Sequence, residues 1–169
     1  NKEHFVFYKE LLMLAFVVYI LCLFYVVTFQ DVSWSTSNFI PFKEMFRYHI
    51  GSNLFFRNVI GNMIMFMPYG FFISYFLKLE KAWSPFILSI IASTTIEVTQ
   101  LAIGRVFDID DIFLNIIGGL LGFFCYHVIM RVHDKLPNVL KNQVFYNIMI
   151  IVILIGILFF FKDTIAIGG

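Results

Sequence analysis

Charged side chains are scarce in this sequence. Only 14% of its 169 residues are Asp, Glu, Lys or Arg, well below the roughly 25% that is usual in soluble proteins. The net charge is +1 with histidine neutral, which argues against a nucleic-acid-binding protein. The two cysteines, Cys22 and Cys125, both lie in apolar runs. We therefore interpret them as small packing residues, not as a disulfide or a metal site.

Apolar residues take the place of the missing charges. They make up 60% of the chain, including 23 phenylalanines, and the mean hydropathy is +0.87. A helix of about 20 apolar residues spans a bilayer. The sequence predicts an all-α, polytopic membrane bundle forming a single domain over residues 1–169. Its five predicted transmembrane helices cover residues 11–29, 59–77, 85–103, 112–130 and 144–161.

Prolines and glycines mark ends and contacts of these helices. Pro68 lies inside the second run, where a membrane helix tolerates it as a kink. The Ser-Pro pair at 84–85 predicts an N-cap and first residue for the third helix, and Gly104 predicts its end. Gly118 and Gly122 form a G-x-x-x-G pair, which predicts close packing against another helix.

Lysine and arginine in the loops indicate the orientation. With a cytoplasmic N-terminus, seven of them lie inside and five outside, so the sequence predicts this orientation. The inner set is Lys2, Lys9, Lys78, Lys81, Arg131, Lys135 and Lys141, and the outer set is Lys43, Arg47, Arg57, Arg105 and Lys162.

Polar residues within the spans and beside their ends gather at one membrane face. Because successive helices reverse direction, the start of the second helix, the end of the third and the start of the fourth lie at the same side, which is the outer face in the predicted orientation. We predict a ligand-binding cluster there. Its members are Asn58, Asn62, Glu97, Gln100, Arg105, Asp108, Asp111 and Asn115.

Glu97 is the most costly member of this cluster. It lies about 9 Å inside the predicted end of its helix, and a carboxylate at mid-membrane costs roughly 2.5–3.5 kcal/mol. It needs a partner, and Arg105 is the cation nearest in sequence. Two interpretations stay open: a functional site, or a buried network that only locks helices together. For Asp108 and Asp110, helix capping or a solvated turn is the simpler interpretation, and Asp111 could itself be the cap.

The outer loop, residues 30–57, contains an amphipathic stretch. PFKEMFRYHI, residues 41–50, places apolar side chains on one side and Lys43, Glu44 and Arg47 mostly on the other. This pattern predicts a short interfacial helix that begins at Pro41 and covers the polar cluster from the water side.

Four motifs in succession resemble the VanZ-like family of small bacterial membrane proteins. They are NFIPFKE, RNVIGNMIMFMPYGFF, STTIEVTQ and GRVFDIDDIFLNIIGGLLGFF, within residues 11–131. The resemblance implies a multi-pass protein of the Gram-positive plasma membrane that acts in the cell envelope. In some members it implies lower susceptibility to teicoplanin and related lipoglycopeptides. The family's recurring polar positions correspond to all eight residues of the predicted cluster and also to Asn38.

Two mechanisms are compatible with these residues. The favoured one is a non-enzymatic binder, in which the cluster holds the head of a lipid-linked cell-wall precursor or the lipoglycopeptide itself. The alternative is a membrane-embedded enzyme acting on a lipid-linked phosphate, with Glu97 as general base or with Asp108 and Asp111 holding a magnesium ion. No metal site or cofactor is predicted with the binder, because His127 and His133 lie towards the opposite face.

Overall fold

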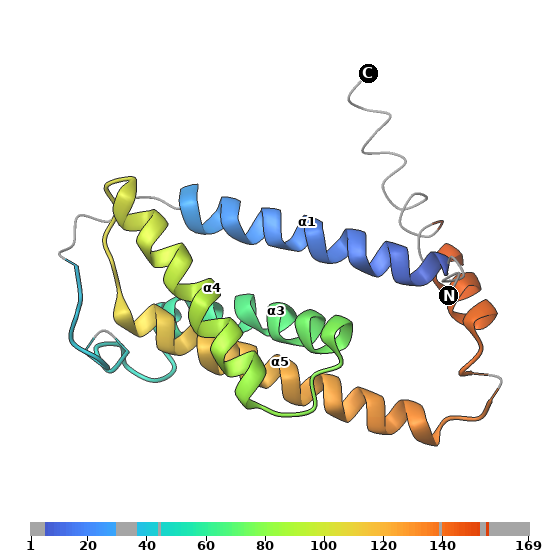
Figure 1. Ribbon diagram of the computed structural model, residues 1–169. Coiled ribbons are helices and arrows are strands. Elements are labelled where there is room, and N and C mark those ends of the chain that lie inside the picture. The colour runs from blue at the N-terminus through green and yellow to red at the C-terminus, as the bar shows by residue number, and fades with distance from the viewer. Residues whose placement is uncertain (1–5, 30–36, 44, 139, 153–154, 156–169) are drawn as a thin grey trace. The chain divides into compact units, whose positions relative to one another are not determined.

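The computed structural model describes residues 6–29, 37–43, 45–138, 140–152 and 155. The described chain is helical and has no strand, which confirms the all-α class (Figure 1). The helices are α1 (Phe7–Phe29), α2 (Asn53–Phe55), the π-helix η1 (Phe56–Ile60), α3 (Gly61–Leu77), α4 (Trp83–Ala102) and α5 (Ile109–Lys135), followed by a shorter apolar helix, Gln143–Val152.

Four stretches of the described chain are long and apolar enough to cross a membrane. They are Phe7–Val26, Asn53–Leu77, Trp83–Ala102 and Ile109–Lys135, and each overlaps one of the first four predicted spans. The chain is a multi-pass membrane protein. The predicted fifth span, 144–161, extends beyond the described residues, so the total of five stays a prediction.

The contacts divide the chain into two compact units. One comprises Asn1–Ala15 and Arg131–Gly169, where the Tyr8 backbone N–H donates to Asn147 Oδ1 over 3.0 Å. The other, Phe16–Met130, contains η1, α3, α4 and most of the residues discussed below. The expected single domain over residues 1–169 stays a prediction.

The end of α4 is set by Gly104, as predicted. Its φ of 83° lies in the left-handed region, which glycine adopts without a Cβ penalty. The Arg105 N–H then donates to Gln100 O over 2.9 Å, and the Gly104 N–H donates to Leu101 O over 3.1 Å. These two bonds form a Schellman motif. They turn the chain sharply between α4 and α5.

The start of α4 differs from the prediction. The helix begins at Trp83 with Ala82 as its N-cap, and no side chain caps it, so the assignment of Ser84 as the N-cap was wrong. Pro85 instead lies in the first turn. Backbone N–H groups of the first turn have no partner within the helix, so a proline is tolerated at this position as well.

Close backbone contact joins α3 to α5. A Cβ added at Gly118 would collide with the backbone of Met63, and one at Gly122 with that of Met67. On the facing helix, a Cβ at Gly70 would collide with the backbone of Gly119. The predicted close packing at the G-x-x-x-G pair is therefore confirmed. Its contribution is geometric, because small residues let two helix backbones approach.

Apolar side chains serve both as core and as outer surface. Leu23 of α1, Phe66 of α3 and Ile96 of α4 form a buried cluster, and the Tyr19 hydroxyl donates to Met65 O over 2.5 Å. In contrast, Ile91 of α4 is 58% exposed. Many other large apolar side chains on the helices are exposed as well, which suits helices surrounded by lipid.

Substitution of Gly70 by alanine tests the helix contact. Because the new methyl group would collide with the Gly119 backbone, we expect the helices to separate and the free energy of unfolding to fall by about 1–3 kcal/mol, as for other overpacked contacts. Thermal unfolding of the purified protein in detergent measures this. Gly61→Ala is the matched control, because its Cβ would lie 3.6 Å from Phe56 O, an ordinary contact. Equal melting temperatures for the two variants would contradict the packing.

Candidate functional site

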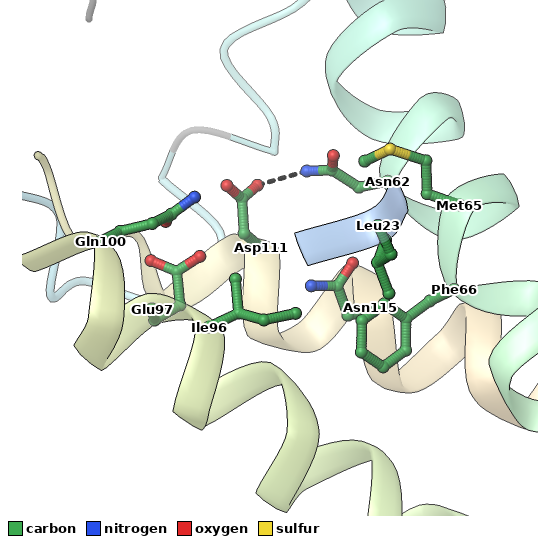
Figure 2. Close-up of a pocket in the computed structure, with 9 residues that line it drawn as sticks. All are labelled: Leu23, Asn62, Met65, Phe66, Ile96, Glu97, Gln100, Asp111 and Asn115. Carbon is green, nitrogen blue, oxygen red and sulfur yellow. Dashed lines mark hydrogen bonds between the residues drawn. The ribbon is translucent and has the colours of Figure 1, made fainter. Parts of the chain in front are cut away.

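A small polar cavity lies where α3, α4 and α5 meet. Its volume is about 30 Å³, room for roughly two water molecules. Figure 2 shows Glu97, Gln100 and Asp111 pointing towards one another above an apolar floor that includes Ile96. The lining residues are Leu23, Asn62, Met65, Phe66, Ile96, Glu97, Gln100, Asp111 and Asn115.

Glu97 lines the cavity from α4 and is 2% exposed. Its Oε2 accepts a hydrogen bond from the Asp108 backbone N–H over 2.9 Å. The predicted direct pair of Glu97 with Arg105 stays a prediction. The helix ends at Ala102, so Glu97 lies about 8 Å inside its end at helical rise.

Two amide side chains make hydrogen bonds between helices at the cavity. Asn62 of α3 donates through Nδ2 to Asp111 Oδ1 of α5 over 2.5 Å. Asn115, one turn further along α5, donates through Nδ2 to Ser93 Oγ of α4 over 2.9 Å. Each bond joins two helices, so the polar groups fix the arrangement of α3, α4 and α5 as well as lining the space between them.

Asp108 caps α5, the simpler of the roles considered for it. The helix begins at Ile109, and Asp108 Oδ1 accepts the backbone N–H of Asp110 over 2.9 Å, the usual bond of an N-cap side chain. The same oxygen accepts Asn38 Nδ2 over 2.9 Å. Asp111 is therefore not the cap, and its carboxylate is directed into the cavity (Figure 2).

Asn38 joins the loop between α1 and α2, called the first loop below, to the start of α5. Its backbone N–H donates to Phe107 O over 2.8 Å, and its carbonyl accepts the Ile109 N–H over 3.1 Å. Together these bonds form a parallel bridge between Asn38 and Asp108. The segment is therefore held by both backbone and side chain.

The predicted interfacial helix over 41–50 is not confirmed, because the described residues of this stretch form turns. Phe42 has a φ of 67°, which interrupts a right-handed helix. Asp110, 1% exposed, holds this conformation by accepting the N–H groups of Phe42 over 2.5 Å and Met45 over 3.0 Å. The Phe42 ring also stacks on Phe113, with centroids 5.2 Å apart.

The structure gathers part of the predicted cluster. Five members line the cavity: Asn62, Glu97, Gln100, Asp111 and Asn115. The other three lie outside its lining: Asn58 is in η1, Arg105 is in the turn after α4, and Asp108 is the helix cap.

Sequence reasoning missed the apolar part of the lining, Leu23, Met65, Phe66 and Ile96. These side chains carry no chemical signature in the sequence. Ser93, which accepts a hydrogen bond from the Asn115 amide, was not among the predicted site residues. The sequence signal for it is its place one turn before Glu97 on the polar side of α4.

Comparison with known proteins assigns the relationship. The family model described as VanZ/LLP1 matches residues 16–131. This chain belongs to the VanZ/LLP1 family. Protein VanZ of Enterococcus faecium is 32% identical over 102 residues, which are 59% of this chain and 62% of that protein. The chain thus spans about three-fifths of the length of that relative. No solved structure matches.

The VanZ/LLP1 match nearly coincides with one compact unit of the structure. That unit is Phe16–Met130, and the match covers residues 16–131. All nine residues that line the cavity fall within both ranges. The cavity therefore belongs to the part of the chain that defines the family.

Substitution of Asp110 by asparagine tests how the loop is held. The amide offers one acceptor oxygen where the carboxylate offers two, so the N–H of either Phe42 or Met45 loses its bond, at a cost of about 1–3 kcal/mol. We expect faster hydrogen exchange over residues 37–46, measured by mass spectrometry. Asp134→Asn, at a mostly exposed side chain, is the control. Unchanged exchange in Asp110→Asn would show that these bonds do not hold the loop.

Proposed function

We propose that this VanZ/LLP1 protein acts in the bacterial cell envelope and lowers susceptibility to teicoplanin or related lipoglycopeptides. It does so by binding the head of a lipid-linked cell-wall precursor or the lipoglycopeptide itself at the polar cluster that surrounds the cavity, towards the outer leaflet. The observation that carries the proposal is the lining: two carboxylates and three amides from three candidate membrane-spanning helices surround one space.

A purely structural role explains the cavity less well. Polar groups that serve only to lock helices are most stable when they contact one another and leave no space between them. Here Glu97, Gln100 and Asp111 surround a space large enough for water (Figure 2). Water in a polar cavity can be displaced by a ligand that makes the same hydrogen bonds.

In the proposed orientation, with the N-terminus in the cytoplasm, the cavity opens towards the outer leaflet. It lies near the end of α4 and the beginnings of α3 and α5, which are on the outer side in that arrangement. Arg105 and Asp108 lie in the turn between α4 and α5, close to where a head group would enter. The exposed apolar faces of the helices would contact the acyl chain of the ligand.

An enzyme acting on a lipid-linked phosphate is the second candidate. Glu97 and Asp111 share one cavity, as a general base and a substrate-orienting acid would. Against magnesium bound by Asp108 and Asp111, Asp108 Oδ1 is engaged by Asn38 and Asp110. Within the described part of the chain, no three His, Cys, Asp or Glu side chains are grouped to hold a metal. A magnesium ion would therefore need ligands from the substrate, and we favour the binder.

Antibiotic susceptibility tests the proposal directly. In a susceptible Gram-positive host, the parent should raise the inhibitory concentration of teicoplanin but not that of vancomycin. Glu97→Gln and Asp111→Asn each remove a charge from the cavity. Each should lower the inhibitory concentration of teicoplanin at least fourfold from the parent's value, towards that of the empty vector, on the order of 1 kcal/mol of lost binding. Asp134→Asn should protect like the parent. Membrane abundance is matched by immunoblot, and full protection by both cavity variants would refute the role of the cavity.

Magnesium dependence separates the two mechanisms. If the protein only binds its ligand, its melting temperature should be the same in magnesium chloride as in EDTA. The magnesium chloride is used at 5 mM, on the order of a saturating concentration for typical magnesium sites. A rise that Asp111→Asn abolishes and Asp134→Asn retains would instead support the enzyme.

A further inference from the structure

The described part of the first loop exposes several large apolar side chains. Phe39, Ile40, Phe46 and Ile50 are between 62% and 89% exposed, and Phe42 is 48% exposed. Single apolar side chains are common on the surface of soluble proteins, whereas many in one short segment mark a surface that contacts an apolar partner. The loop therefore needs a partner, and its own contacts indicate which one.

Ring contacts place the loop beside the start of α5 (Figure 1). The Phe39 ring stacks on Phe107, with centroids 5.1 Å apart, and the Phe42 ring stacks on Phe113. Phe113 is four residues beyond the beginning of α5 at Ile109, about 6 Å along the axis at helical rise, and falls within the predicted span 112–130. Phe42 is therefore at the level where this helix enters the lipid.

The backbone of the loop is also suited to an apolar surrounding. In the described chain from residue 40 to residue 46, every backbone N–H group has an acceptor within the protein. The donors are Ile40, Phe42, Lys43, Met45 and Phe46, and Pro41 has no N–H. Lipid requires such internal bonds, because it offers no hydrogen bonds of its own. A loop in water does not need them, since water can bond to its N–H groups.

We propose that the first loop is inserted into the lipid leaflet on the cavity's side of the membrane, where its exposed apolar side chains contact phospholipid acyl chains. An interfacial segment of this kind lies about 5–10 Å into the boundary between head groups and acyl chains. Lys43 is exposed, and its long side chain can hold the ammonium group among the lipid phosphates. The loop would thus lie beside the helices, in the lipid, and not over the polar cluster in water. This inference does not depend on the ligand of the cavity.

Tryptophan fluorescence in nanodiscs measures the surroundings of the loop. The reporter is Phe46→Trp in the full chain, with Trp34→Phe and Trp83→Phe removing the two native indoles. The nanodiscs contain phospholipid brominated either near the glycerol end or near the methyl end of its acyl chains, and acrylamide is the quencher in water. Ile91→Trp, in the middle of α4 and 58% exposed at the native residue, is the matched lipid-facing control. Each variant is used only if its melting temperature equals that of the parent.

We expect Phe46→Trp to lose more fluorescence to bromine near the glycerol end than to bromine near the methyl end, and Ile91→Trp to show the opposite order. The largest loss should be comparable for the two reporters. Acrylamide should quench Phe46→Trp far less than it quenches N-acetyltryptophanamide, a fully water-exposed indole.

Two results would overturn the inference. Strong quenching of Phe46→Trp by acrylamide, without quenching by brominated lipid, would place the loop in water. Quenching by neither reagent would show that protein covers the loop, such as a second copy of this chain. Both results would leave the proposed function to its own test by antibiotic susceptibility.

Discussion

The cost of placing carboxylates inside membrane-spanning helices governs the rest of this structure. A carboxylate near the centre of a bilayer costs roughly 2.5–3.5 kcal/mol, and an unpaired buried polar group adds to the penalty. Hydrogen bonds from the Asp108 N–H to Glu97 and from the Asn62 amide to Asp111 offset part of this cost. Because these donors come from the α4–α5 turn and from α3, the two acids require that three helices and one turn keep a fixed relation.

The backbone contacts supply that relation. Gly70, Gly118 and Gly122 bring α3 and α5 together closely enough that a Cβ would not fit, so Asn62 can reach Asp111. The start of α5 is held separately, because Asp108 and Asp110 bind the first loop through Asn38, Phe42 and Met45. Glu97 links the two parts: it lines the cavity and accepts the N–H of the helix cap. A ligand that displaces this bond would act on the loop as well.

Much of the site could be predicted from the sequence, because helical periodicity and alternating helix direction are enough to bring Glu97, Gln100 and Asp111 to one membrane face. The loop could not. Residues 41–50 satisfy an amphipathic helical pattern. However, Asp110, 68 residues beyond Phe42, accepts a hydrogen bond from the Phe42 N–H and stabilises Phe42 in the left-handed region. Such a contact between distant residues overrides a local pattern and has no local signal. Leu23 was missed for a related reason, since an apolar side chain facing a cavity has the same sequence pattern as one facing lipid.

The proposed function requires the cavity to open towards the outer face of the membrane, and cysteine accessibility tests this most directly. Met65 lines the cavity, and its side chain makes none of the polar bonds described there. Met65→Cys would be introduced after replacing Cys22 and Cys125 with alanine, and intact cells treated with a membrane-impermeant, positively charged methanethiosulfonate reagent. We predict that Met65→Cys reacts in intact cells, whereas Leu77→Cys, exposed at the other end of α3, reacts only after permeabilisation. Reaction of Met65→Cys only after permeabilisation, or not at all, would contradict the account.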